Sequence, residues 1–207
     1  MEEKWLEWSK KLQAIAQIGR TFSENPYDIE RYEEIEQIAL AIMSEASGVE
    51  MGVLKPLFVP PTGYVTPKVD LRAAVFNTEQ QILLVKETAD GLWTLPGGWA
   101  DVCEPPSLGI EREVLEESGY IVKVSKLAAV LDRSLHDHEP PFPYHIYKHF
   151  FICELLGGEA KISHETAAVD FFGRDEIPPL STSRVLPEQI ELMFDHYLHP
   201  ERPTVYD

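Results

Sequence analysis

Hydrophobic residues recur at a helical period in two stretches near the start of the chain. The first spans residues 5–22, with apolar positions at Trp5, Trp8, Leu12, Ile15, Ala16 and Ile18. The second spans residues 28–47 and ends at a glycine, with apolar positions at Tyr32, Ile35, Ile38, Ala39, Ile42 and Met43. This spacing predicts two amphipathic helices. Two helices of this size cannot bury their apolar faces alone, so we expect them to pack on the rest of the chain or on a second copy.

Runs of apolar and β-branched residues with turn signals between them dominate the rest of the chain. They predict strands over residues 69–77, 81–86, 121–132, 146–156 and 169–172, and residues 93–95 lead into a glycine loop. Helical patterns occupy residues 105–118 and 187–197. Residues 49–68 are rich in proline, which is typical of an extended linker. We therefore expect a small helical N-terminal domain and linker over residues 1–62, followed by an α/β domain over residues 63–207.

The most specific chemistry lies in residues 95–120, which read LPGGWADVCEPPSLGIEREVLEESGY. In the helix predicted here, Glu113, Glu116 and Glu117 follow an i, i+3, i+4 spacing, which places three carboxylates on one face. Like charges so placed repel each other by about a few tenths of a kcal/mol per pair unless a cation lies between them. Carboxylate oxygens suit Mg²⁺ or Mn²⁺ shared with a substrate phosphate. The alternative is a solvated acidic helix face.

The same stretch resembles the signature of the Nudix hydrolases. The pattern of Gly, five residues, Glu, seven residues and Arg-Glu-apolar-x-Glu-Glu-x-Gly is matched from Gly98 through Glu104 and Arg112 to Gly119. Only the last slot departs, where Tyr120 replaces an aliphatic residue, and that departure concerns packing. The resemblance implies a mixed sheet in an α/β/α sandwich. It also implies that water attacks one phosphorus of a nucleoside diphosphate linked to a group X.

The resemblance also implies a role for each motif residue. Glu113, Glu116 and Glu117 would hold divalent metal with a backbone carbonyl near Gly98, and Arg112 would orient a glutamate. Glu104 is the expected partner of Arg112. Metal ions activate the attacking water and neutralise the pyrophosphate.

The sequence does not identify a single residue as the general base. The segment SHETAAVDFF resembles a loop in which a Glu-Thr pair is often followed by a second glutamate, but Ala168 stands in that place. This leaves Glu165, Glu113 and Glu117 as candidates, with an ordinary exposed loop residue as the alternative for Glu165. Arg72 and Lys86 are the strand-borne cations nearest the motif in sequence and are candidates for contact with a phosphate.

The N-terminal helices extend the resemblance over nearly the whole chain, to a subgroup that hydrolyses X-linked nucleoside diphosphates, including CDP-choline pyrophosphatases of bacilli. We expect CDP-choline as substrate and ADP-ribose as the main rival. A choline group needs aromatic faces, and the candidates include Trp99 and Tyr144, with further aromatics at Trp5, Trp8, Trp93, Phe142 and Tyr147. Between the strands predicted over residues 121–132 and 146–156, the segment SLHDHEPPFPYH is expected to be a loop at the edge of the substrate site. Its HDH stretch is expected to be solvated surface, with metal ligation by His136, Asp137 and His138 as the alternative. A homodimer through the N-terminal helices is expected.

Composition narrows the remaining possibilities. A formal net charge of −17 disfavours tight binding to nucleic acid, so an RNA-end nuclease is a weaker alternative. A catalytically silent nucleotide sensor is a third reading, disfavoured by the intact glutamates. No apolar run approaches the roughly eighteen residues of a membrane span, and no secretory leader is evident, so a cytoplasmic location is expected. Cys103 and Cys153 are too few for a disulfide framework and are expected to be reduced.

Overall fold

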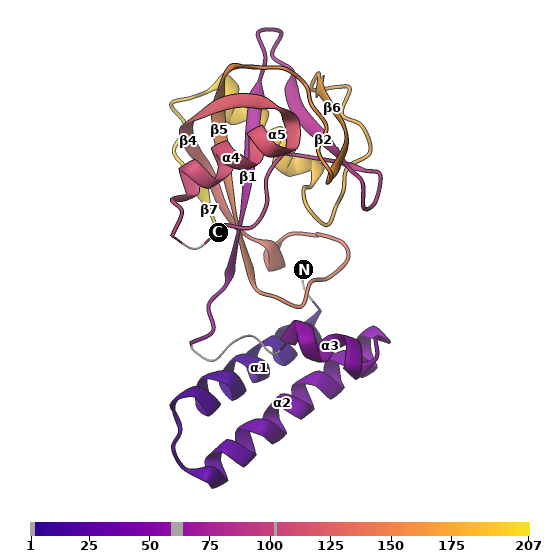
Figure 1. Ribbon diagram of the computed structural model, residues 1–207, viewed down its shortest axis with the longest axis vertical. Helices are drawn as coiled ribbons and strands as arrows, with labels where there is room; N and C mark the ends of the chain where they lie inside the picture. Colours follow the sequence, from indigo (N-terminus) through magenta and orange to yellow (C-terminus); the bar gives the residue numbers. More distant parts are fainter. Residues whose placement is uncertain (1–2, 59–63, 102) are drawn as a thin grey trace. The chain divides into compact units, whose positions relative to one another are not determined.

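The computed structural model describes residues 3–58, 64–101 and 103–207. The chain divides into two compact units, which are treated separately below. The first comprises Met1–Pro67 with Pro141–His145, and the second comprises Lys68–Pro140 with Ile146–Asp207 (Figure 1). The boundary expected after residue 62 lies outside the described residues.

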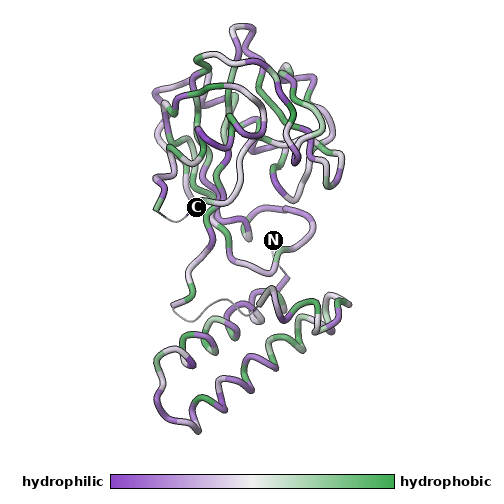
Figure 2. The backbone as a smooth tube through the Cα atoms, viewed as in Figure 1, coloured by the Kyte–Doolittle hydropathy of each residue, from purple (hydrophilic) through white to green (hydrophobic). Residues whose placement is uncertain are grey.

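The first unit is built from three helices, α1 (Lys4–Phe22), α2 (Pro26–Ser47) and α3 (Met51–Phe58). Helices α1 and α2 pack along each other as an antiparallel pair, and hydrophobic and hydrophilic positions alternate along both (Figure 2). Gly48 ends α2 in the left-handed conformation that its position predicts. Both expected helices are therefore present.

The buried face of α1 agrees only in part with the one that the hydrophobic spacing predicted, since Ala16 is buried as expected. The side chains buried in α1 are those of Leu6, Ser9, Gln13 and Ala16. Trp8 is 56% exposed and Ile15 is 52% exposed, although both were assigned to the apolar face. The contact with α2 buries small and polar side chains beside Leu6, whereas Trp8 and Ile15 lie on the exposed side.

Helix α3 corrects the prediction of an extended linker over residues 49–68. Leu54 is 5% exposed and packs in one cluster with Leu6, Leu40 and Met43. This burial stabilises a short helix in spite of Pro56, which lies inside it near its C-terminal end. The proline content of this segment did not predict the helix, because the burial of Leu54 against α1 and α2 stabilises it.

The second unit contains a seven-stranded mixed sheet in the order β3-β2-β1-β5-β4-β7, with β6 paired to β2. Its strands are β1 (Lys68–Phe76), β2 (Ile82–Glu87), β3 (Trp93–Thr94), β4 (Tyr120–Asp132), β5 (Ile146–Gly158), β6 (Thr166–Phe172) and β7 (Val205–Tyr206). β1 and β5 run parallel, as do β4 and β7, whereas the other pairs are antiparallel.

Two helices cover opposite faces of this sheet. Side chains of β1 alternate, so that Leu71 and Val75 join the cluster beneath α4 (Pro106–Ser118), whereas Ala74 and Phe76 join the cluster beneath α5 (Pro187–Leu198). The α/β/α sandwich with a mixed sheet, preceded by a helical N-terminal region, is thus confirmed. Tyr120 occupies the aliphatic slot by packing edge-on against Phe171 at 5.4 Å between ring centroids.

The segment between β4 and β5 is more ordered than expected. A short 3-10 helix spans Arg133–Leu135, and His138 is only 5% exposed, so the prediction that the HDH stretch is solvated surface is wrong for His138. Its Nδ1 atom lies 2.8 Å from the Thr182 carbonyl oxygen and its Nε2 atom 3.0 Å from Gln189 Nε2. Burial therefore lowers the pKa of His138 to about 3, and the neutral ring ties this segment to the start of α5.

None of the helices in the described part of the chain is long and apolar enough to cross a membrane. The thiol of Cys153 is buried, which raises its pKa to about 12, so it is a packing residue. Cys103 is exposed on the loop before α4.

Candidate active site

The glycine loop before α4 lies directly against β1. Leu71 donates its backbone N–H to the Gly98 carbonyl at 2.8 Å, and Ala73 donates to the Pro96 carbonyl at 2.9 Å. Gly97 has a φ of +138°, and a Cβ atom at this position would lie 2.0 Å from the Leu71 carbonyl oxygen. Only glycine allows this approach, which fixes the loop beneath the acidic face of α4.

Glu117 is the most deeply buried carboxylate of α4, with 6% exposure. Its Oε2 atom accepts the backbone N–H of Gly97 at 2.8 Å. Burial raises the pKa of Glu117 to about 8, in spite of the opposing charge of Arg72, and the negative charge of Glu113 adds to the rise. A carboxylate in this setting is stabilised in its charged form when a cation lies beside it.

Glu113 faces the same glycine loop one turn earlier in the helix. A Cβ atom added to Gly98 would lie 3.3 Å from a carboxylate oxygen of Glu113, so the two groups are in near contact. Burial also raises the pKa of Glu113, while Arg112 at 3.0 Å opposes the rise. Glu113 and Glu117 therefore converge on the loop at Gly97 and Gly98.

Arg112 holds the acidic side chains of this region together. Its Nη2 atom lies 2.9 Å from Glu104 and 3.2 Å from Asp101, and its Nη1 atom lies 2.9 Å from Glu116. The charge-assisted bonds to Glu104 are the main reason that the Arg112 pKa is raised. The ion pair between Arg112 and Glu104 that the resemblance implied is thus present. Glu116, by contrast, is more than half exposed and turns toward Arg112.

This set of oxygens fits a divalent cation of the Mg²⁺ type. The three glutamates lie on one short helix, and hard oxygen ligands are what Mg²⁺ prefers. In addition to burial, the charge of Glu113 raises the pKa of Glu117, and the charge of Glu116 raises the pKa of Glu113. In the described part of the chain, no three acidic, histidine or cysteine side chains already stand at the spacing of a complete metal site. Arg112 draws Glu116 aside, so the full set needs Glu116 to rotate. The Gly98 carbonyl keeps one lone pair beyond its bond to Leu71.

Arg72 lies beside this centre but is not exposed to solvent. It is 6% exposed, forms two hydrogen bonds with Asp70 at 2.7 and 3.0 Å, and donates to the Leu95 carbonyl at 3.1 Å. Lys148 on the neighbouring strand also bonds to Asp70. The charge of Arg72 acts on Glu117 and Glu87. Arg72, a candidate for contact with a phosphate, is therefore paired with a carboxylate in this structure. Lys86 is half-buried on β2 opposite Ala168.

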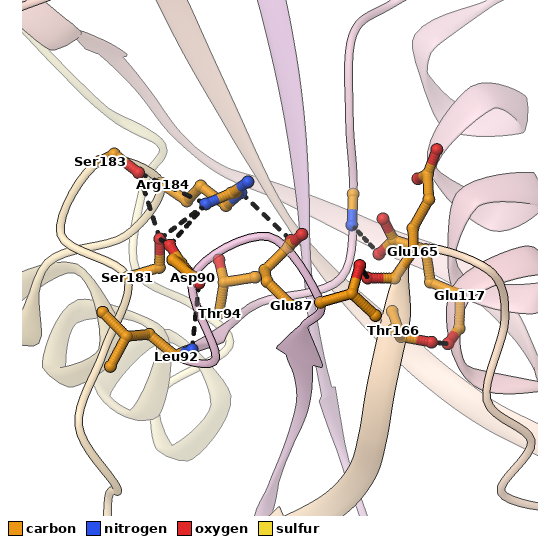
Figure 3. Close-up of polar contacts among 12 residues, drawn as sticks. Glu87, Asp90, Leu92, Thr94, Glu117, Glu165, Thr166, Ser181, Ser183 and Arg184 are labelled. Carbon is orange, nitrogen blue, oxygen red and sulfur yellow. Dashed lines mark hydrogen bonds and ion pairs between the residues drawn. The ribbon is translucent and has the colours of Figure 1, made fainter.

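The loop that carries Glu165 is anchored on both sides. The Glu165 carbonyl accepts the backbone N–H and the hydroxyl of Thr88, each at 2.9 Å. The buried hydroxyl of Thr166 donates to the Glu117 carbonyl at 2.8 Å (Figure 3). The Glu165 side chain is 59% exposed. The segment is thus tied directly to α4 while the Glu165 carboxylate remains accessible.

A second group of charged residues adjoins Glu117 and was missed from the sequence. Glu87 at the end of β2 is 9% exposed, and Arg184 lies 3.2 Å from it and 2.9 Å from Asp90 (Figure 3). Ser181 donates its hydroxyl to Asp90 at 2.7 Å. Burial raises the pKa of Glu87. The sequence signal for Glu87 was an acidic residue at the end of the predicted strand ILLVK. Its partner Arg184 lies far along the chain, so no local pattern indicated the ion pair.

The aromatic candidates fall into different environments. Trp99 follows Gly98, is 45% exposed, and has the Lys68 ammonium 5.3 Å from its ring centroid. Trp93 packs edge-on against Phe172 in the core. Tyr144 and Phe142, with ring centroids 5.5 Å apart, belong to the first compact unit. Trp99 and Tyr144 were both expected at the substrate. Trp99 belongs to the second unit and adjoins the glycine loop there, whereas Tyr144 belongs to the first unit.

Two family descriptions match the chain. Residues 66–192 match the NUDIX domain, and residues 3–58 match the UDP-X-like, N-terminal oligomerisation domain. YjhB of Bacillus subtilis, provisionally named an ADP-ribose pyrophosphatase, is 43% identical over the whole of this chain and 99% of its own.

Two solved structures of related enzymes also resemble this chain. A UDP-X diphosphatase superposes with a TM-score of 0.63 and 32% identity, covering 99% of this chain and 98% of its own. An ADP-ribose pyrophosphatase of Streptococcus suis has a TM-score of 0.60 and 37% identity, covering 69% of this chain and 100% of its own.

Proposed function

This chain belongs to the NUDIX family and is a Nudix pyrophosphohydrolase, and we propose that it uses Mg²⁺ to hydrolyse ADP-ribose to AMP and ribose 5-phosphate. The observation that carries the metal-dependent hydrolysis is the convergence of Glu113 and Glu117 on the loop at Gly97 and Gly98. Two relatives named as ADP-ribose pyrophosphatases, at 43% and 37% identity, support the choice of substrate.

The motif residues would have separate roles in metal binding and orientation. Glu113, Glu116 and Glu117, with the Gly98 carbonyl, would hold the metal, and Arg112 with Glu104 would set their orientation. Bound Mg²⁺ neutralises the pyrophosphate and acidifies the attacking water. One P–O bond of the pyrophosphate bridge breaks, the water oxygen joins the attacked phosphorus, and two phosphate monoesters leave.

We assign Glu165 as the acceptor of the proton lost by the attacking water. Thr88 and Thr166 hold its loop against β2 and α4, so the exposed carboxylate has a fixed starting point beside Glu117. Glu113 and Glu117 are less suitable because each already serves the glycine loop and the metal. A positioned base of this kind contributes typically 10²–10⁴-fold.

CDP-choline is the second candidate substrate, supported by one specific contact. The exposed ring of Trp99 already carries the Lys68 ammonium over its face at 5.3 Å, directly beside the glycine loop. Quaternary ammonium groups bind to aromatic faces in the same way. If CDP-choline is the substrate, Trp99→Leu should raise its KM while leaving the KM for ADP-ribose unchanged.

The test is release of phosphate monoesters from ADP-ribose, CDP-choline, a dinucleoside polyphosphate and a short RNA with Mg²⁺, with the Glu116→Gln variant as the blank. We expect ADP-ribose to have the highest kcat/KM. A clear preference for CDP-choline would replace the assigned substrate. Absence of turnover on every substrate, with metal binding intact, would reject hydrolysis and favour a nucleotide sensor.

We also propose that the helices of the first unit join two copies of the chain. Trp8, Ile15 and Phe22 recur every seven residues along α1 and are 56%, 52% and 67% exposed. A stripe of large apolar side chains of this kind marks an interaction surface. The match of residues 3–58 to an oligomerisation domain supports this reading.

A further inference from the structure

Arg184 belongs to a loop that is held against the strand leading into the glycine loop. The backbone N–H of Trp93 in β3 donates to the Pro179 carbonyl at 3.1 Å, and that of Ser181 donates to the Trp93 carbonyl at 2.8 Å. Arg184 itself donates its backbone N–H to the Ser181 carbonyl at 2.8 Å. Because β3 runs directly into the glycine loop, these bonds fix Arg184 relative to that loop.

The guanidinium of Arg184 is bound on one side and open on the other. Its Nε atom lies 3.2 Å from the Glu87 carboxylate, and its Nη1 atom lies 2.9 Å from Asp90 and 2.8 Å from the Ser181 hydroxyl (Figure 3). Nη2 makes no hydrogen bond to any residue that the structure describes, and the side chain is 28% exposed. Since a guanidinium is a rigid fork of N–H donors, the donors of Nη2 can bind a further acceptor.

The partner of Arg184 also connects it electrostatically to the proposed metal site. Burial raises the pKa of Glu87 against the opposing charges of Arg184 and Arg72, and the negative charge of Glu165 adds to the rise. Burial likewise raises the pKa of Glu117, and the charge of Glu87 contributes there. Glu87 is therefore near enough to Glu117 and Glu165 for their charges to interact, and Arg184 lies directly against Glu87.

The two arginines closest to the motif carboxylates are already fully engaged. Arg72 is 6% exposed and donates to Asp70 and to the Leu95 carbonyl. In Arg112, the Nε, Nη1 and Nη2 atoms all donate to carboxylates. Arginine binds phosphate oxygens through directed, charge-assisted hydrogen bonds. Arg184 offers the accessible donors for such a bond that Arg72 and Arg112 lack.

We propose that Arg184 binds a phosphate oxygen of the substrate pyrophosphate through Nη2, and that Glu87 and Asp90 hold its guanidinium in place. This inference rests on the proposed hydrolysis of a nucleoside diphosphate derivative. Arg184 contacts the substrate, whereas Glu87 and Asp90 are positioning residues. The alternative role for Arg184, balance of the buried Glu87 charge alone, requires no contact with substrate.

The experiment measures calorimetric binding of methylenediphosphonate to the full-length protein with Mg²⁺. This probe resembles pyrophosphate, resists hydrolysis because carbon bridges its two phosphorus atoms, and has no base, sugar or choline. Arg184→Gln should weaken its binding by at least about tenfold, the effect of one lost charge-assisted hydrogen bond. Arg184→Lys should cause a smaller loss, because lysine keeps the charge but not the fork.

A double variant separates contact with the probe from charge balance. Glu87→Gln combined with Arg184→Gln removes both members of the ion pair, so no charge at Glu87 is left unbalanced. We expect this variant to bind the probe as weakly as Arg184→Gln does. Recovery of the affinity of the unmodified protein would show that Arg184 only balances Glu87, and would overturn the proposal. If Arg184→Gln does not fold, the double variant and Arg184→Lys decide the question.

The matched control is Arg174→Gln, which removes another arginine of the second unit that two carboxylates bind. Arg174 lies 2.7 Å from Glu191 and 3.4 Å from Asp195, both on α5. This variant should leave the affinity for the probe unchanged. Unchanged affinity in Arg184→Gln, or no binding to the unmodified protein at millimolar probe, would overturn the proposal. Weaker binding by Arg184→Gln without turnover of any substrate by the unmodified protein would reject only the proposed activity.

Discussion

The backbone N–H of Gly97 donates a hydrogen bond to the Glu117 carboxylate at 2.8 Å, across 20 residues of sequence. This bond joins the glycine loop to α4. It also fixes the Glu117 carboxylate, whose pKa burial raises to about 8, at the proposed metal site. The protonation of Glu117 should therefore govern both metal affinity and the stability of the metal-free protein.

We predict that the metal-free protein loses stability as pH rises from about 4.5 to 8. The folded-state pKa of Glu117 lies above its ordinary value of 4.5, so the folded state holds a proton that the unfolded chain has released. Stability then falls by up to about 1.4 kcal/mol per pH unit in this window. Glu117→Gln keeps an acceptor for Gly97 but cannot ionise, so it should lack this loss. Thermal unfolding in EDTA from pH 5 to 8.5 measures the difference.

Saturating Mg²⁺ should reverse this pH trend in the unmodified protein, because the metal binds the ionised carboxylate. The matched control is Glu79→Gln, an exposed carboxyl on the turn between β1 and β2, which should behave as the unmodified protein does. Identical pH profiles for Glu117→Gln and the unmodified protein in EDTA would contradict the assigned cause.

Gly97→Ala should unfold the second unit, whereas Gly91→Ala should not. Both glycines have positive φ, +138° and +70° respectively. A Cβ atom at Gly97 would lie 2.0 Å from the Leu71 carbonyl oxygen, but one at Gly91 would meet nothing within 4 Å. We expect Gly91→Ala to cost about 1–2 kcal/mol and Gly97→Ala more than about 4 kcal/mol. Urea unfolding measures both, and equal costs would show that the glycine loop is not pinned to β1.

Neutralising Glu116 and Glu104 should reduce activity by different amounts. Outer-shell partners of a metal ligand typically contribute 10–100-fold, so Glu104→Gln should fall in that range. Glu116→Gln removes a proposed ligand and should lose more than about 100-fold in kcat. Both side chains are partly exposed, so the folded state should be nearly unaffected. Steady-state kinetics against Mg²⁺ concentration tests this, and full activity of Glu116→Gln would reject its role as a ligand.

The motif helix could be predicted closely because its signals are local. Ser107 begins a run of helix formers and Gly119 ends it in the left-handed conformation, with φ of +77°. The carboxylate spacing along α4 follows from the same period. By contrast, Glu87 and Arg184 form an ion pair at 3.2 Å from segments almost a hundred positions apart, and no local pattern encodes that contact.

The buried face of α1 illustrates a second limit. Hydrophobic spacing selects Trp8 and Ile15, but the contact with α2 buries Ser9 and Gln13 instead. Small and polar residues allow two helices to approach closely, and large ones remain for another surface. A sequence pattern shows which residues are apolar. It does not show whether they pack within the helix pair or lie on its outer surface.

Thr166→Val should lower both stability and turnover because it disconnects the Glu165 loop from α4. The Thr166 hydroxyl is buried and donates to the Glu117 carbonyl at 2.8 Å. Losing it leaves a buried carbonyl with one partner fewer, at a cost of about 1–3 kcal/mol. We expect kcat to fall while KM stays constant, since the proton acceptor and not the substrate site is displaced.

Thr88→Val is the matched control for that change. Its hydroxyl is exposed, and the Glu165 carbonyl keeps the backbone N–H of Thr88 at 2.9 Å. This variant should lose less than about 0.5 kcal/mol and retain nearly full kcat. If the two valine variants have the same kcat, the link from Thr166 to α4 does not position Glu165.

Ile15→Glu should convert the proposed dimer into a monomer. Ile15 lies at the centre of the exposed stripe on α1, between Trp8 and Phe22, and is 52% exposed within one chain. Glutamate is a good helix former, so α1 itself should persist while a buried charge at the interface opposes association. Sedimentation equilibrium at micromolar concentration measures the mass. The control Ile162→Glu changes an equally exposed isoleucine, 59% exposed, in the second unit and should leave the mass unchanged. A monomeric unmodified protein would reject the interface, whereas a dimeric Ile15→Glu variant would place it elsewhere.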